Sequence, residues 1–97
     1  MLTRKKPETL AANITITGQL EEIEFPVVFF NRSQEEVEQW FKDNPGKLVI
    51  PYIIKHWDAE YELSEKGAQE AESDRPGITL ALTQAFYEAR RVAIKGN

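Results

Sequence analysis

His56 is the residue whose type is best suited to acid–base catalysis at neutral pH. It is the only histidine of a 97-residue chain that contains no cysteine. A histidine beside Asp58 could act as a general base, but the sequence marks no nucleophile near it. We therefore interpret His56 as a half-exposed polar residue just before Trp57. We predict no catalytic residues and no enzymatic activity.

Three carboxylates follow His56 at the alternate positions with which a calcium loop begins: Asp58, Glu60 and Glu62. An EF-hand loop also needs glycine at its sixth position and glutamate at its twelfth. Those positions hold Leu63 and Gln69 in this chain, so we expect no metal site and interpret the acids as a solvated edge. The five glycines are scattered singly, which leaves no phosphate-binding loop, and we expect no cofactor.

The distribution of charge argues against nucleic acid as a partner. Residues 8–88 hold all 16 acidic residues but only 6 of the 12 basic ones, so this body carries a charge of −10. An acidic body repels phosphate groups. The sequence shows no signal peptide, and its longest nearly apolar run, residues 48–54, is far shorter than the roughly 20 residues that span a bilayer. We expect no membrane partner and a cytoplasmic location.

Length and composition predict one small folded domain. A chain of 97 residues closes a single hydrophobic core, and 41% apolar residues is the share of an ordinary soluble protein. Residues 1–8 are charged and without periodicity, so we expect a flexible basic tail followed by a single α+β domain over 9–97. Apolar and polar residues alternate over 12–17 and 23–30, which predicts an N-terminal β-hairpin. Pro26 cannot donate a ladder hydrogen bond, so the second strand should have an open side there.

Three to four helices are expected after the hairpin. Ser33 and Glu36 form a capping box that begins the first helix, and the turn at 44–46 ends it. Residues 47–57 are ambiguous, because their β-branched residues indicate a strand whereas Pro51 suits the first turn of a helix. A helix that begins near residue 49 is the preferred interpretation, with the strand as its alternative. Residues Asp58 to Leu63 read as an extended link.

The longest helix is expected at the C-terminal end. Before it, Ser64 caps a short helix over 65–73 that contains Gly67, at a cost of roughly 1 kcal/mol relative to alanine. The last helix should begin at Asp74–Gly77, with proline in its first turn, and run to about Ile94. Its predicted core stripe consists of Ile78, Leu82, Ala85, Ala89 and Val92. The apolar residues off this stripe are Leu80, Phe86, Tyr87 and Ile94.

Apolar residues outside the core stripes predict a protein-binding surface. Leu80 and Tyr87 are seven residues, or about two turns, apart on the opposite face of the last helix, so both should be exposed. Val28 and Phe30 lie on the second face of their strand. An apolar face wider than the core requires is typical of a surface that binds a partner. These four residues are the candidate partner-binding residues.

The order and spacing of several short elements resemble the tail-assembly chaperones of long-tailed bacteriophages. In that pattern a Trp-Asp pair leads through an aromatic residue to a Ser-Glu helix start, an acidic-x-Pro-Gly turn and an alanine-spaced last helix. The matching residues are Trp57-Asp58, Tyr61, Leu63-Ser64-Glu65, Asp74-x-Pro76-Gly77, Ala81, Ala85, Glu88-Ala89-Arg90 and Lys95-Gly96-Asn97. In the first half the matches are Phe25 to Phe30 and Arg32-Ser33-Gln34-Glu35-Glu36.

This resemblance implies a non-enzymatic function in phage or prophage tail morphogenesis. Such chaperones keep the long, largely helical tape-measure protein soluble while tail-tube subunits polymerise around it. They act in the bacterial host cytoplasm and use no cofactor. The alternative is a small acidic phage or bacterial inhibitor that binds a nuclease or other DNA-binding protein, which the −10 charge of the body would suit.

Overall fold

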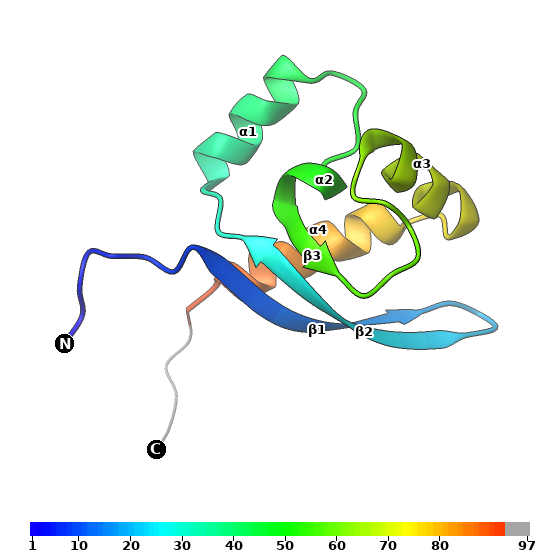
Figure 1. Ribbon diagram of the computed structural model, residues 1–97, viewed down its shortest axis with the longest axis horizontal. Coiled ribbons are helices and arrows are strands. Elements are labelled where there is room, and N and C mark those ends of the chain that lie inside the picture. Colours follow the sequence, from blue (N-terminus) through cyan, green and yellow to red (C-terminus); the bar gives the residue numbers. More distant parts are fainter. Residues whose placement is uncertain (93–97) are drawn as a thin grey trace.

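The structure is a computed structural model that describes residues 1–92. It contains a three-stranded antiparallel sheet, built from an N-terminal hairpin and a third strand from the middle of the chain. The strands are β1 (Thr9–Thr17), β2 (Glu22–Phe30) and β3 (Ile54–Trp57). β1 and β2 form the predicted hairpin, and β3 pairs with the second half of β2, so β2 is central (Figure 1). The side of Pro26 that lacks an N–H donor faces β3, at the point where β3 ends. The carbonyl oxygen of Pro26 accepts a hydrogen bond from the N–H of Asp58.

Four helices follow the hairpin within the described residues, and the last is the longest. They are α1 (Gln34–Asp43), α2 (Ile50–Ile53), α3 (Glu65–Asp74) and α4 (Ile78–Arg90). α1 begins at the predicted capping box, in which the Ser33 hydroxyl accepts from the Glu36 N–H at 3.1 Å and the Glu36 carboxylate accepts from the Ser33 N–H at 3.0 Å. The Ser64 hydroxyl caps α3 in the predicted way. The α+β fold class is confirmed.

The hydrophobic core lies between the inner face of the sheet and the helices. Alternation along β2 turns Phe25, Val27 and Phe29 inward, and all three are buried. The Phe29 ring meets the Phe86 ring of α4 edge to face, with 5.6 Å between ring centroids. α4 therefore covers the inner face of the hairpin, behind which it passes in Figure 1. The opposite, outer face of β2 points away from α4.

The ambiguous segment 47–57 contains both predicted structures in succession. Pro51 lies in the first turn of α2, as expected, but α2 is a single turn that gives way to β3 at Ile54. The preferred helix was therefore wrong from Ile54 onward, and Trp57 lies on β3 with its Cα opposite that of Val27. The second half of β2 offers unpaired backbone groups on this side. A β-branched segment satisfies them better as a strand than as a longer helix.

The last helix differs from its prediction at both ends and in its buried face. It begins only after Gly77, whose φ of 98° is left-handed, so Pro76 precedes the helix instead of lying in its first turn. It ends at Arg90, which leaves Val92 exposed beyond the helix; Ile94 lies outside the described residues. Phe86, predicted off the core stripe, is completely buried. The core face is centred on positions spaced by four, namely Ile78, Leu82 and Phe86.

The segment between β3 and α3 is bent, so the predicted extended link was wrong. The indole N–H of Trp57 donates to the Tyr61 carbonyl oxygen at 2.9 Å, which turns the chain back on itself. The bent segment then packs directly on the backbone of α3. A Cβ on Gly67 would lie 1.8 Å from the Glu62 carbonyl oxygen, so only glycine permits this approach. This contact explains why a residue unfavourable to helices stands in α3.

Candidate functional site

A shallow groove runs between the end of α1, the segment before α2 and the first turns of α4. Its cavity volume is about 420 Å³. We call it the α4 groove; it is lined by Phe41, Lys47, Leu48, Val49, Glu72, Gly77, Thr79, Leu80 and Thr83. The side chains of Phe41 and Leu80 are 45% and 63% exposed. The groove thus brings together two large exposed apolar residues from helices that are distant in the sequence.

α4 carries Leu80 and Tyr87 on one exposed face. They are two turns apart, and Tyr87 is 41% exposed with its ring against that of Phe86, at 5.3 Å between centroids. Leu82, two residues from Leu80, is completely buried. The exposure of both predicted residues follows from the helical spacing. Their part in binding a partner stays a prediction.

A carboxylate from α3 holds the beginning of α4. The N-cap of α4 is Gly77, which has no side chain to cap the helix. Glu72 instead accepts from the N–H of Gly77 at 2.6 Å and from the N–H of Thr79 at 3.0 Å. The hydrogen bond from the Gly77 amide is the largest cause that lowers the pKa of Glu72, and hydrogen bonding from Thr79 is the second. The ionised carboxylate also offsets the positive end of the helix dipole.

Sequence reasoning missed Glu72 because the cap comes from the preceding helix. The usual sequence signal is an Asn, Asp, Ser or Thr directly before the helix, and α4 has glycine there. The available signal was indirect: a carboxylate five residues before a glycine that begins a helix. Glu72 positions the helix that carries Leu80, because it accepts hydrogen bonds from two amides at the beginning of α4. It also lines the α4 groove.

The other two candidate residues, Val28 and Phe30, lie on a different surface. Both are half-buried on the outer face of β2. The guanidinium of Arg32 lies 4.4 Å from the ring centroid of Phe30 and 3.9 Å from that of Tyr52. Its Nε also donates to the Tyr52 carbonyl oxygen at 2.6 Å, and the Tyr52 ring stacks on Trp40. Phe30 is therefore covered by the chain's own residues.

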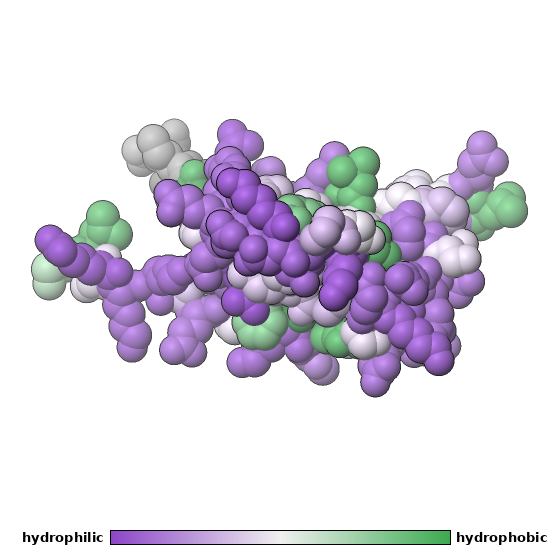
Figure 2. All heavy atoms as spheres, turned by 90° about the horizontal axis from the view of Figure 1, so that it is seen from above, coloured by the Kyte–Doolittle hydropathy of each residue, from purple (hydrophilic) through white to green (hydrophobic). Residues whose placement is uncertain are grey.

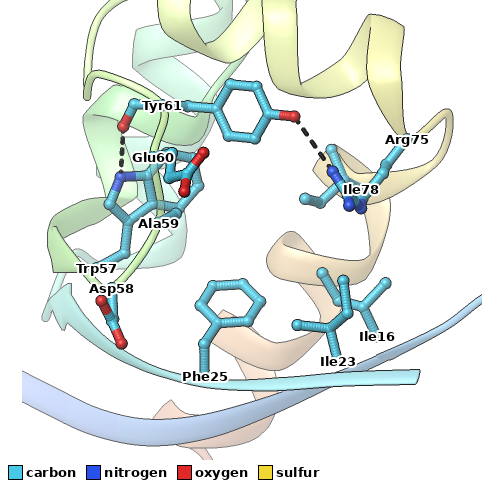
Figure 3. Close-up of a pocket in the computed structure, with 10 residues that line it drawn as sticks. All are labelled: Ile16, Ile23, Phe25, Trp57, Asp58, Ala59, Glu60, Tyr61, Arg75 and Ile78. Carbon is cyan, nitrogen blue, oxygen red and sulfur yellow. Dashed lines mark hydrogen bonds between the residues drawn. The ribbon is translucent and has the colours of Figure 1, made fainter. Parts of the chain in front are cut away.

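A pocket of about 350 Å³ lies at the hairpin-turn end of the molecule, between the sheet, the bend after β3 and the α3–α4 turn (Figure 3). Its apolar wall is formed by Ile16, Ile23, Phe25, Trp57 and Ile78. Arg75 stands at its edge and donates from Nε to the Glu21 carboxylate at 2.8 Å and from Nη1 to the Tyr61 hydroxyl at 3.1 Å. That hydroxyl donates to Asp74, which raises the pKa of Tyr61. These polar groups satisfy one another, so the pocket offers a ligand mainly apolar contact.

The residues first considered for chemistry do not converge on one point. His56 is exposed on β3, with its Cα opposite that of Val28. Asp58 and Glu60 line the pocket of Figure 3, while Glu62 accepts a hydrogen bond from the Ser64 hydroxyl. Among residues 1–92, no group of three or more His, Asp or Glu side chains is arranged to hold a metal ion.

On the face seen from above in Figure 2, polar side chains cover most of the surface. The apolar side chains on this face lie in small separate patches. In the described part of the chain, no helix has the length and apolar character needed to cross a membrane. Comparisons of the chain with protein-family models, curated proteins and solved structures gave no match.

Proposed function

We propose that this chain is a non-enzymatic tail-assembly chaperone of a phage or prophage. Its α4 groove would bind a helical segment of the tape-measure protein in the cytoplasm of the bacterial host. The observation that carries the proposal is the pair of exposed apolar side chains that line the groove, Phe41 and Leu80. Single exposed apolar residues are ordinary, but two on a common hollow offer a partner's side chain a place to bury.

The geometry of α4 favours a helical segment as the occupant. Leu80 and Tyr87 are separated by two turns, or about 10 Å along the helix axis. A partner helix that lies along α4 with apolar residues at the same spacing would contact both. This is the helix-in-groove mode of recognition, in which anchors recur every three, four and seven residues. The largely helical tape-measure protein of the resembling family has the structure that this mode requires.

The charge of the domain supports a carrier function. The body carries −10 between residues 8 and 88, and a large net charge keeps a protein soluble. Inside the α4 groove, the carboxylate of Glu72 accepts hydrogen bonds from two main-chain N–H groups of its own chain. The rest of the groove therefore offers mainly apolar contact. Such a domain could hold an apolar segment while its own surface prevents aggregation.

Co-expression with a candidate phage tape-measure protein tests the proposal. The expected result is that the tape-measure protein stays in the soluble fraction only when this chain is present. An unrelated acidic protein of similar size serves as the control for non-specific solubilisation. A tape-measure protein that precipitates equally with and without this chain would contradict the proposed function.

A further inference from the structure

The free edge of β1 is long, regular and uncharged. β1 is the outer strand of the sheet, and among residues 1–92 no strand pairs with its second edge (Figure 1). It runs for nine residues, Thr9–Thr17, with no irregularity in its pairing to β2. A strand in a globular protein is usually about 5–6 residues long. The segment contains no charged residue, no proline and no glycine.

The hydrogen-bond pattern shows which backbone groups point outward. The N–H of Asn31 donates to the Glu8 carbonyl oxygen, and the N–H of Gly18 donates to the Glu21 carbonyl oxygen. Alternate residues of an antiparallel pair bond to their partner, so the even-numbered residues of β1 bond to β2. The odd-numbered residues from 9 to 17 present their N–H and C=O groups to the free edge.

The opposite edge of the sheet is protected in the usual ways, whereas β1 is not. β3 is four residues long, its pairing contains an irregularity, and it carries the exposed residues Lys55 and His56. Short length, bulges and lysine are the devices by which proteins prevent pairing at a sheet edge. The described edge of β1 has none of them. An edge of this kind is suited to pairing with another strand.

We propose that β1 pairs antiparallel with β1 of a second copy of the chain, which would join two sheets into one of six strands. A register centred on Asn13 places Ala11 opposite Thr15 of the second copy, and only odd-numbered residues then exchange hydrogen bonds. About ten main-chain bonds would form. On the inner face, Leu10 would lie opposite Ile16 and Ala12 opposite Ile14 of the second copy. The half-buried Leu10, Ala12 and Ile16 would gain apolar neighbours.

The composition of β1 favours a second copy as the occupant of this edge, because antiparallel pairing of the strand with itself places apolar residues opposite apolar residues on the inner face. Two bodies that each carry −10 repel one another, so the uncharged β1 is the segment along which they can approach at the smallest electrostatic cost. In the proposed register every facing pair is uncharged, because both strands have the sequence Thr9–Thr17. The inference does not depend on the chaperone function, since it concerns a different surface from the α4 groove.

Analytical ultracentrifugation of two substitutions at one position tests the pairing. The N–H of Thr15 faces the free edge, so Thr15→Pro removes a donor needed only between copies and should weaken dimerisation about 100-fold. Thr15→Ala keeps the donor and should remain a dimer of about twice the 11.2 kDa chain mass. A wild-type chain that sediments as a monomer, or a dimer that folded Thr15→Pro leaves intact, would overturn the proposal.

Cysteine cross-linking keeps the test decisive if Thr15→Pro unfolds. The chain has no cysteine, so Asn13→Cys introduces a single thiol in each copy. In the proposed register these two positions lie opposite one another, with about 5.5 Å between their Cα atoms. This distance permits a disulfide bond. In Thr17→Cys the two thiols would be about 27 Å apart along the strand. Covalent dimers should form under mild oxidation with Asn13→Cys alone. Equal cross-linking of both variants, or of neither, would overturn the proposal.

Discussion

The exposed face of α4 and the outer face of β2 both carry apolar residues on the side that the sequence predicts to be polar. On α4, the side chains of Leu80 and Tyr87 project from the surface and are 63% and 41% exposed. On β2, Phe30 is half-buried beneath the guanidinium of Arg32, which is itself stacked on Tyr52. The first face thus has apolar surface to offer a partner, whereas much of the second is already used within the chain.

This difference shows that periodicity identifies an unusual residue but not what covers it. Leu80 and Phe30 break the pattern of their elements in the same manner. Their environments differ because Arg32 follows β2 directly and reaches back over Phe30. A surface should therefore be assigned to a partner only after the cover provided by other segments is known.

The largest effect on stability is expected from two leucines that lie two residues apart on α4. Leu82→Ala should lower the free energy of unfolding by about 2–5 kcal/mol, because Leu82 is completely buried and its loss leaves a cavity. Leu80→Ala should change it by no more than about 0.5 kcal/mol. Urea unfolding of both variants measures the difference. Equal losses would mean that α4 is rotated relative to the described packing.

A smaller loss is expected when the cover of Phe30 is removed. Arg32→Ala should lower the free energy of unfolding by about 1–3 kcal/mol, because it deletes two cation–π contacts and a hydrogen bond to Tyr52. Arg32→Lys keeps the charge but loses the planar stacking, so it should recover only part of this stability. Thermal unfolding of the two variants tests the assignment. An unchanged melting temperature in Arg32→Ala would show that the outer face is open after all.

Glu72 links the stability of α4 to pH. Its pKa is lowered in the folded state, so its contribution is present above the unfolded value of about 4.5 and is lost as the pH falls through the lower folded value. At neutral pH, Glu72→Gln should cost about 0.5–2 kcal/mol, as the loss of a helix cap does. Urea midpoints of wild type and variant should converge below about pH 4.5. Glu70→Gln, an exposed change on the same helix, is the control, and a pH-independent gap would contradict the capping role.

The smallest effect is expected at His56, which lies on the outer face beside Val28. His56→Ala should leave both stability and the solubility of a co-expressed client nearly unchanged, because the residue is exposed and no catalysis is assigned to it. Client solubility in co-expression is the readout. Its loss in a folded His56→Ala variant would restore a functional role to this face and weaken the contrast with α4.

The features that sequence predicted well are local ones. The capping box at Ser33, the cap at Ser64 and the alternation of the hairpin each depend on residues a few positions apart. The exposure of Leu80 and Tyr87 also followed from helical spacing alone. These predictions required no knowledge of where other segments pack.

The features that were missed depend on contacts between distant segments. The choice between helix and strand after Pro51 depends on the free side of β2, which a local pattern does not contain. Gly67 is explained only by the backbone of Glu62 against α3. The α4 groove required the end of α1 and the beginning of α4 to meet, so Phe41 was not among the predicted binding residues.

The central proposal is that the exposed face of α4 binds the client. Pull-down of a purified tape-measure fragment by the Leu80→Ser/Tyr87→Ser double variant, with thermal unfolding in parallel, tests it directly. The predicted result is loss of binding, with the free energy of unfolding changed by no more than about 1 kcal/mol. The control is Leu20→Ser, which alters a fully exposed leucine in the hairpin turn. This control variant should bind like wild type. A stable double variant that still captures the fragment would contradict the claim.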